Sequence, residues 1–439
     1  MINNCNGKNN HINILLVNPW IIDFKAYDLW MKPLGLLNIS SILRRNGYNV
    51  YLIDCLDRNH ESVIKKGRDY GTGKFESEII EKPALYKKIP RYYKRYGISL
   101  EAFLNDLKKI PHPDIILVTS GMTYWYPGVH LAISMLKEKY PSIPVILGGI
   151  YATVCSDFAK IHSRAVVFPG SNMSEFLYLL ETYTGINHTF YGPFSPDYSH
   201  YEKLDYASIV TSKGCPYNCT YCASKKLDPS FVSRNPYEVI SEIKFIKKSC
   251  NISDFAFYDD ALLLNPGIKT ILEEVSREYL KFHTPNGVHS GFIDLTMAGL
   301  LRKAGFKIIN LSLETVDENI RILTGNKVKI YEFESALDNL YREGFSKKDI
   351  RIYTMMAIPG QTFHEVDKTI DYIFKLGLKN NLSVFSPVPG SCDFTKIKSD
   401  LSDPLTHNTS YQYYVGEWFT FEERKFLMDK VHRLNSRVS

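Results

Sequence analysis

The sequence predicts an α/β protein. We expect an N-terminal doubly wound parallel sheet of the Rossmann type, then a partial or full (β/α) barrel of the TIM type and a short C-terminal extension. Three observations support this. Short apolar runs alternate with segments of helical spacing along both halves of the 439 residues. Polar and glycine-containing motifs follow several runs, at the expected carboxyl ends of parallel strands. A stretch containing glycine and proline, 187–204, separates the two series.

The first series occupies residues 1–190. Its apolar runs are typical of strands buried on both faces, and they lie at 12–18, 50–54, 114–119, 145–147 and 165–168. Helical spacing follows three of them, at 34–46, at 128–140 and from Met173 onward. The insertion 57–113 is basic and tyrosine-rich, so we expect either a functional loop or a solvated helical excursion there.

The second series occupies residues 191–390. The expected strands lie at 207–211, 255–258, 287–290, 307–313, 350–357 and 383–385. The expected helices lie at 237–248, 269–279, 295–304, 331–342 and 363–375. Repeated units of this kind predict a barrel whose chemistry lies at the carboxyl ends of its strands. Residues 391–439 form the extension, with one expected helix at 420–434.

Composition excludes several classes of protein. Lys and Arg number 53 and Asp and Glu 47, a net charge of +6. This charge is compatible with an anionic substrate but is too small to indicate a nucleic-acid binder. No apolar run reaches the roughly 18 residues of a transmembrane helix. The segment 1–11 is polar and lacks the apolar core of a signal peptide, so we expect a cytoplasmic protein.

Three of the eight cysteines, Cys215, Cys219 and Cys222, fall within the segment KGCPYNCTYC. Their spacing gathers three thiolates around one point after a predicted strand. Structural zinc takes four protein ligands, yet the nearest other candidates are His200 and Cys250. Three readings are therefore open: a four-iron cluster with one open iron, a zinc site completed by a distant ligand, or three ordinary thiols.

The C-x-x-x-C-x-x-C pattern, with an aromatic residue before its last cysteine, resembles the radical S-adenosylmethionine (SAM) superfamily. FYDDAL at 257–262, LSLET at 311–315 and AIPGQT at 357–362 are similar to the motifs that follow the second, fourth and fifth strands in that family. The resemblance implies that the three cysteines hold a [4Fe-4S] cluster whose open iron binds SAM. It also implies that reduction of SAM yields a 5′-deoxyadenosyl radical.

The same resemblance implies further contacts to SAM from Tyr221, near the adenine, and from Asp259, Glu314 and Pro359. Asp259 and Glu314 have an alternative role in structural salt bridges at the barrel mouth. His289 ends a predicted barrel strand. We expect it to position substrate or to act as an acid–base group, with a structural hydrogen bond as the alternative.

The N-terminal half resembles the cobalamin-binding domain that precedes the SAM domain in one subfamily. The resemblance rests on Asn18-Pro19, KPLGLL at 32–37, Ile53-Asp54, Ser120-Gly121 and GGIYAT at 148–153. It implies a cobalamin site with contacts from Ser120, Thr123, Gly148, Gly149, Tyr151 and Thr153. The D-x-H-x-x-G motif that supplies a histidine to cobalt in other proteins is absent from 54–61. Two alternatives follow: the domain binds cobalamin without a protein ligand to cobalt, or it has lost the ability to bind cobalamin.

Together these features predict a radical SAM enzyme, in its main form a cobalamin-dependent methyltransferase acting on an unactivated carbon. The alternatives are a non-methylating rearrangement, cyclisation or C–C coupling enzyme and, more remotely, a zinc- or cluster-stabilised binding protein. We expect a small-molecule or lipid-like substrate, anionic and docked by the Lys and Arg side chains of 86–96, including Arg91 and Arg95. We also expect a flavodoxin- or ferredoxin-type reductant, no nucleic acid, and oxygen sensitivity suited to an anaerobic host.

Overall fold

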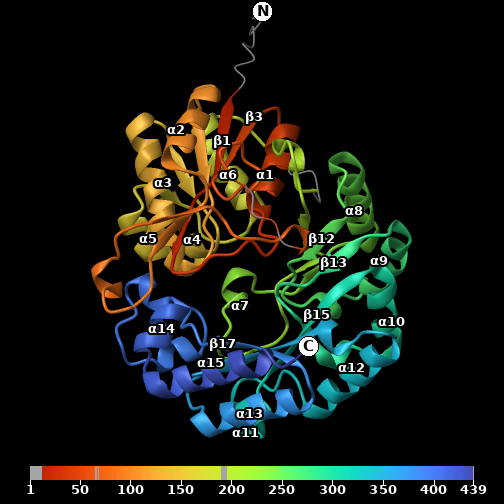
Figure 1. The fold of residues 1–439 in the computed structure, drawn as a ribbon. Coiled ribbons are helices and arrows are strands. Elements are labelled where there is room, and N and C mark those ends of the chain that lie inside the picture. Colours follow the sequence, from red (N-terminus) through yellow and green to blue (C-terminus); the bar gives the residue numbers. More distant parts are fainter. Residues whose placement is uncertain (1–11, 65–66, 68, 189–194, 439) are drawn as a thin grey trace, which may run out of the picture.

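The computed structural model describes residues 12–64, 67, 69–188 and 195–438. The predicted polar segment 1–11 and Gly192-Pro193 of the predicted linker lie outside the described residues. Figure 1 shows an upper lobe built by the first half of the chain and a lower lobe built by the second. Within the described ranges, every helix is too short or too polar to cross a lipid bilayer.

The upper lobe is a five-stranded parallel sheet in the order β3-β1-β6-β7-β8. Its strands are β1 (Asn13–Asn18), β3 (Asn49–Asp54), β6 (Ile115–Val118), β7 (Val145–Leu147) and β8 (Val166–Val167). Alternate β1 residues pack on opposite faces: Leu16 on the side of α1 (Leu34–Arg45) and α6 (Met173–Thr184), Leu15 on the side of α2 (Leu100–Lys109) and α3 (Tyr126–Lys139). The doubly wound sheet is confirmed, and its strand order reverses between β1 and β6, where a ligand crevice is expected.

The insertion 57–113 contains its own secondary structure. β4 (Ser77–Ile79) and β5 (Lys94–Tyr96) form an antiparallel sheet with β2 (Ile21–Asp23), which the sequence did not reveal. Tyr86 and Tyr93 pack against Phe24 in a small core. Arg95 is buried, 2.6 Å from Glu78. Arg95 is therefore structural and cannot dock a substrate, which corrects that part of the prediction; Arg91 is exposed.

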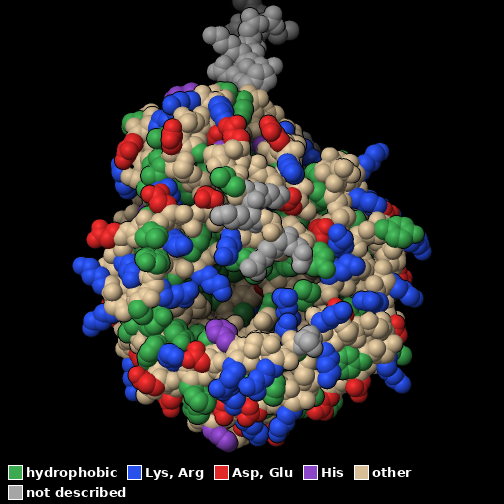
Figure 2. Space-filling model, viewed as in Figure 1, with side chains coloured by type: hydrophobic (Ala, Val, Ile, Leu, Met, Phe, Trp, Pro, Cys, Tyr) green, Lys and Arg blue, Asp and Glu red, His purple; other side chains and the backbone are tan. Residues whose placement is uncertain are grey.

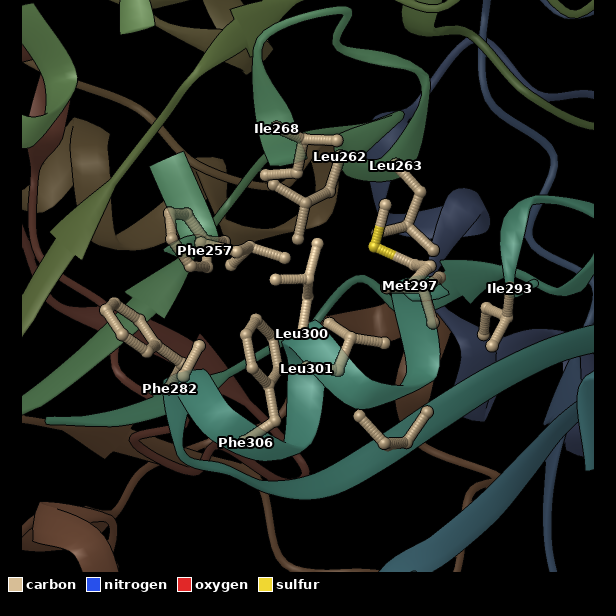
Figure 3. Packing of buried hydrophobic residues seen from close by; sticks show 14 of the residues in the cluster. Phe257, Leu262, Leu263, Ile268, Phe282, Ile293, Met297, Leu300, Leu301 and Phe306 are labelled. Carbon is tan, nitrogen blue, oxygen red and sulfur yellow. The ribbon is translucent and has the colours of Figure 1, made fainter. Parts of the chain in front are cut away.

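The lower lobe is a partial barrel of parallel strands in the order β17-β16-β15-β13-β12-β9. The strands are β9 (Ala207–Ile209), β12 (Asp254–Phe257), β13 (Lys281–His283), β15 (Phe306–Glu314), β16 (Ile350–Met356) and β17 (Lys379–Val384). The helices that alternate with them are α8 (Pro236–Cys250), α9 (Ile268–Val275), α10 (Leu295–Ala304), α12 (Ile330–Arg342) and α13 (Phe363–Lys375). Figure 3 shows Phe257, Phe282 and Phe306 from three neighbouring strands packed against α10, with ring centroids 5.0 and 5.6 Å apart.

Some predicted boundaries in the barrel are wrong. The third strand is β13, which the sequence analysis missed, whereas the predicted strand at 287–290 is only the short β14 (Val288–His289) beside β15. The predicted helix at 269–279 ends as α9 at Val275, and a single turn follows at Ser276–Glu278. The expected last strand at 383–385 begins earlier, as β17 at Lys379.

The C-terminal extension joins the two lobes. Its helices are α14 (Thr409–Val415) and α15 (Phe421–Asn435), and α15 was predicted. α15 packs on α13 and β17 of the barrel. Just before α14, Asn408 Nδ2 donates to Asp23 Oδ1 at 2.8 Å, and the Leu405 carbonyl accepts from the Tyr86 hydroxyl at 2.7 Å. The extension therefore fixes the barrel to the upper lobe.

Candidate functional site

The three cysteines lie on one loop at the barrel mouth. The loop leaves β10 (Ser212–Lys213), which pairs with β11 (Val232–Ser233), and ends in α7 (Ser224–Leu227). Gly214 opens the loop with φ of +72°, and a Cβ there would lie 2.4 Å from the Ser230 carbonyl oxygen. Burial raises the pKa of the Cys219 thiol to about 11. A positively charged group that replaced its proton would offset that cost, as a metal centre does.

Residues from elsewhere in the chain hold the loop from two sides. Thr220 N donates to the Thr324 carbonyl at 3.3 Å, and Asp393 N donates to the Thr220 carbonyl at 2.9 Å. The Thr220 hydroxyl also donates to Asp393 Oδ2 at 2.7 Å. Gly325 has φ of +107°, and its Cβ position lies 2.9 Å from the Asn218 carbonyl oxygen, so only glycine allows this approach. The loop is thus fixed before any cofactor binds.

The spacing of the cysteines fits a cluster better than a single ion. Tetrahedral zinc, with Zn–S bonds of about 2.3 Å, would bring three sulfurs to within about 3.8 Å of one another. Among the described residues, His60, Glu61 and Asp106 bring three candidate ligand atoms within 4.8 Å of one another. The three cysteine sulfurs do not come this close together. The distant zinc ligands also lie elsewhere: His200 contacts Ser40 and Asp197, and Cys250 ends α8. The loop therefore suits a [4Fe-4S] cluster.

Glu314 and Tyr221 meet beside Cys219, and their predicted contacts with SAM stay predictions. Glu314 ends β15 in a left-handed conformation (φ of +60°), where the register with β16 is interrupted. Its carboxylate lies 3.3 Å from Lys327 Nζ. Burial and then the Glu314 carboxylate raise the pKa of Tyr221 well above its usual range. Burial alone would lower the pKa of Lys327, but Glu314 and Cys219 outweigh it and raise that pKa.

Lys327 was not predicted. A lysine on a loop is ordinarily solvated, and the sequence carries no signal that this one faces the cysteines. Its placement follows from the turn at Gly325, which packs on the cysteine loop. Lys327 therefore holds a positive charge beside the residues that we expect to bind SAM.

Asp259 has a different role from the predicted contact with SAM. It is only 2% exposed. Its carboxylate accepts bonds from the amides and hydroxyls of Thr211 and Ser212, at 2.7–3.0 Å. This placement corrects the prediction: Asp259 positions the residues that lead into the cysteine loop. Its neighbour Asp260 is exposed and accepts a hydrogen bond from Ser224, close to Cys222.

His289 lies against the cysteine loop. Its ring stacks on Tyr217 with centroids 4.8 Å apart, and its Nδ1 accepts from Gly291 N at 3.1 Å. Burial, together with Lys327, lowers the pKa of His289. The neutral ring therefore carries its proton on Nε2. An acid–base role for His289 is chemically compatible with this geometry and stays a prediction.

Pro359 lies in the turn that follows β16. The turn contains two residues with positive φ, Ala357 at +64° and Gly360 at +89°, and Ile358 N donates to Gln361 Oε1 at 3.3 Å. Gly360 packs on Leu323, with 3.0 Å between its Cβ position and that side chain. The turn is thus well fixed at the barrel mouth, and the contact of Pro359 with SAM stays a prediction.

The carboxyl edge of the upper sheet carries a cavity of about 220 Å³. Gly148 and Gly149 line it together with apolar side chains of α1, β7 and α6. The Ser120 hydroxyl donates to the Gly148 carbonyl at 2.6 Å. Gly149 has φ of +93°, and its Cβ position lies 2.4 Å from the Ser120 carbonyl oxygen. Thr153 also shapes this edge, since its hydroxyl donates to the Gly149 carbonyl at 2.8 Å and accepts from Gly170 N at 2.9 Å.

Two residues predicted to contact cobalamin do not reach this edge with their side chains. Tyr151 is fully buried, and its hydroxyl bonds His130 Nε2 at 3.0 Å. Thr123 is 3% exposed, and its hydroxyl lies 3.0 Å from Nδ1 of His407 in the C-terminal extension. Both side-chain predictions are corrected, because these hydroxyls turn away from the sheet edge, towards His130 and His407. The contacts of Ser120, Gly148, Gly149 and Thr153 with cobalamin stay predictions.

The cavity at the sheet edge adjoins the cysteine loop. Lys213, two residues before Cys215, lines the cavity from the barrel side. Ser171, also at the cavity, donates to Asp228 Oδ1 at 2.9 Å just beyond α7. Leu227 of α7 packs against the core of the upper lobe. A ligand seated at the sheet edge would therefore lie next to a ligand bound by the cysteines.

Comparisons with known proteins agree with this arrangement. Residues 209–373 match the model of the radical SAM superfamily. Bacteriochlorophyllide d C-12(1)-methyltransferase of Chlorobaculum tepidum is 20% identical over 310 residues, which make up 65% of this chain and 66% of that protein. GTP 3′,8-cyclase of Trichodesmium erythraeum is 25% identical over 170 residues, 37% and 51% of the two chains. The chain thus spans about half to two thirds of the length of these relatives.

Two solved structures share the fold over nearly the whole chain. The radical SAM methyltransferase TsrM from Kitasatospora setae, with cobalamin and a [4Fe-4S] cluster bound, has a TM-score of 0.67 and 14% identity and covers 96% of this chain and 90% of its own. The cobalamin-dependent enzyme OxsB, with aqua-cobalamin bound, has a TM-score of 0.57 and 14% identity and covers 98% and 62%. The likeness includes both lobes.

Proposed function

We propose that this chain, a member of the radical SAM superfamily, is a cobalamin-dependent methyltransferase that acts on an unactivated carbon. One observation carries the proposal. The glycine-lined cavity at the carboxyl edge of the upper sheet is lined in part by Lys213, which lies two residues before the first cysteine of the barrel loop. Two cofactors bound at these places would lie side by side, as a reaction that uses both requires. TsrM and OxsB, solved with cobalamin bound, support the same pairing.

When bound, the cluster supplies the electron that cleaves SAM, and cobalamin supplies a carrier for the methyl group. Cys215, Cys219 and Cys222 would hold the cluster. Glu314 would accept a hydrogen bond from the amino group of SAM, and Lys327 Nζ, 3.3 Å from its carboxylate, would hold that carboxylate in position. Asp259 keeps the start of the loop in place.

No histidine of the upper lobe is assigned to cobalt. His60 lies where the missing D-x-H-x-x-G motif would supply one, but its Nε2 is 3.0 Å from Asp106 Oδ2 and its Nδ1 is 2.7 Å from the Ser62 hydroxyl. Both ring nitrogens are thus engaged. This supports binding of cobalamin through the cavity walls and without a protein ligand to the metal.

An external reductant belongs to the proposal. Reduction of the cluster by a flavodoxin or ferredoxin should support SAM cleavage in the absence of dithionite. The check is 5′-deoxyadenosine formed with reduced flavodoxin compared with the same mixture lacking it. Equal amounts of 5′-deoxyadenosine in the two mixtures would argue against a flavodoxin or ferredoxin as the reductant.

The cofactor sites can be tested separately. Anaerobic reconstitution with iron, sulfide and hydroxocobalamin should give about four irons and bound corrin per chain. Cys219→Ala should lower iron strongly, whereas the matched variant Cys250→Ala, at the end of α8, should keep it. Binding of zinc in preference to iron would contradict the proposal.

The cavity test uses a graded series at Gly148. A Cβ at Gly148 would meet only the Phe168 carbonyl oxygen, at 3.9 Å, so small side chains fit and larger ones extend into the cavity. Gly148→Leu should abolish corrin binding and leave iron unchanged, and Gly148→Ala should retain most of both. Corrin bound equally well by the leucine variant would place cobalamin elsewhere.

A further inference from the structure

The outer edge of the barrel strand β17 is unpaired where it lines a large cavity. Phe385 N donates to the Met356 carbonyl at 2.9 Å, so odd-numbered residues turn their backbone groups towards β16. The even-numbered Asn380, Leu382 and Val384 therefore turn theirs outward. In the described part of the chain, the backbone groups of Leu382 and Val384 have no partner on that side. Both residues line a cavity of about 710 Å³.

One position of this edge is already occupied by a group that resembles a peptide bond. Asn435 of α15 accepts from Asn380 N at 2.9 Å through its Oδ1 and donates to the Asn380 carbonyl at 2.8 Å through its Nδ2. A neighbouring strand would make the same pair of bonds. Asn380 is 4% exposed, and its side chain turns to Thr354, whose hydroxyl donates to its Oδ1 at 2.6 Å. The edge thus continues as two positions without a backbone partner among the described residues, at the half-buried Leu382 and at Val384, which is 9% exposed.

The charge in the cavity is unbalanced. Lys25 and Arg91 are exposed there, and neither forms a salt bridge within the described ranges; Arg91 donates to the Ser410 hydroxyl at 3.2 Å and acts on the buried Asp23 only over a longer distance. The two acidic residues of the cavity already have hydrogen-bond or salt-bridge partners. Asp23 is buried and accepts from Trp125 and Asn408, and Asp429 is paired with Lys425. An occupant with carboxylate groups would therefore complement the cavity.

The cavity also leads to the site. β17 runs parallel to the other barrel strands, so Val384, at its carboxyl end, lies towards the barrel mouth and the cysteine loop. Trp125 lines this cavity and also a smaller one of about 140 Å³ at the edge of the upper sheet. Figure 2 shows the face hollowed between the two lobes, with Lys and Arg side chains around the opening.

We propose that this groove binds an extended, acidic peptide, added as a further strand to the outer edge of β17, and that this peptide is the substrate. The second part rests on the proposed methyltransferase function. Main-chain bonds to Leu382 and Val384 would hold the peptide in register, and Arg91 and Lys25 would select acidic side chains. A short peptide is larger than the free small molecule that the sequence led us to expect.

The test measures binding without SAM, so it does not depend on activity. The probe is a fluorescein-labelled, acetylated hexapeptide of alternating Val and Glu, titrated with the full-length protein and followed by fluorescence anisotropy. Two further forms are N-methylated at residues 1, 3 and 5 or at residues 2, 4 and 6. Strand addition predicts that one pattern weakens binding at least tenfold and the other changes it little. Equal effects of both patterns, or no binding at millimolar protein, would overturn the proposal.

Charge variants provide a second measurement. Arg91→Glu should weaken binding of the acidic probe at least tenfold, whereas Lys88→Glu, exposed on the same segment but outside the groove, should not. Equal weakening by the two variants would contradict the proposed groove, because binding would then depend only on the overall charge of the protein. Formation of 5′-deoxyadenosine in the same preparation reports the proposed function separately, so failure of one proposal is distinguishable from failure of the other.

Discussion

Gly149 lies where the chain passes closest to Ser120 at the edge of the upper sheet. It needs both a positive φ and the absence of a Cβ, since a Cβ would lie 2.4 Å from the Ser120 carbonyl oxygen. Gly47 has a similar φ of +86° but has open space around it. Gly47→Ala should cost about 1–2 kcal/mol of unfolding free energy, from backbone strain alone. Gly149→Ala should cost at least about 2 kcal/mol more, through the clash; urea unfolding of both variants checks this, and equal costs would contradict it.

Glu314 is the acidic residue that we expect to contact SAM. Glu314→Gln removes a charge-assisted hydrogen bond of about 1.5–3 kcal/mol and should weaken SAM binding tenfold or more. Iron content should stay unchanged. Glu318→Gln, whose exposed carboxylate pairs only with Arg321 one turn away, is the matched control. Calorimetry on the reconstituted protein measures both affinities; normal affinity in Glu314→Gln would assign Glu314 to the salt bridge with Lys327 alone.

Single residues could be predicted where a motif carries them. The cysteines, Tyr221 and Glu314 are identified by their spacing, and the structure brings Tyr221 and Glu314 together beside Cys219. Lys327 and Asp393 could not be found, because they reach the loop from more than 100 residues away through turns without a motif. Tyr151 and Thr123 were misassigned for a related reason: which face of a short helix or turn packs into the core depends on the tertiary contacts.

His407 connects the C-terminal extension to the upper lobe. Burial lowers the pKa of His407 from 6.5 to about 4. Because the folded state favours the neutral ring, this contribution to stability is complete above pH 6.5 and is lost as the pH falls towards 4. Between pH 7.5 and pH 5 the loss is about 2 kcal/mol.

Replacement of His407 should remove that part of the acid sensitivity. His407→Gln should be less stable at pH 7.5, yet lose about 2 kcal/mol less than the parent on going to pH 5. His364→Gln, which changes an exposed histidine, is the matched control. Urea unfolding at the two pH values measures each difference. Parallel pH profiles for His407→Gln and the parent would contradict the assignment.

Elements were predicted well where apolar runs are long and poorly where they are short. β1, β6 and β16 are bounded by clear runs, and their parallel order follows from the alternation with helices. β2 and β13 have three residues each, too few for a periodic signal. The insertion uses its tyrosines as a core, which composition alone cannot distinguish from a solvated surface.

Trp30 contributes to the joint between the lobes. Its ring stacks on His283 of β13 at 4.2 Å, and its carbonyl accepts from the Ser208 hydroxyl of β9 at 2.6 Å. Trp30→Ala should lower the unfolding free energy by about 3–5 kcal/mol. It should also lower the midpoint of thermal unfolding, because the packing of Trp30 between the lobes is lost. Tyr279→Ala, at a residue 93% exposed, is the control; an unchanged unfolding midpoint in Trp30→Ala would contradict this role of Trp30.

The proposed reaction uses one cofactor at each lobe, and the products of SAM distinguish this reaction from its alternatives. The reconstituted enzyme, with reductant and SAM, should form both 5′-deoxyadenosine and S-adenosylhomocysteine. S-adenosylhomocysteine should require bound corrin and disappear in Gly148→Leu, while 5′-deoxyadenosine persists. Formation of 5′-deoxyadenosine alone, unchanged by corrin, would contradict a methyltransferase and favour a non-methylating radical enzyme.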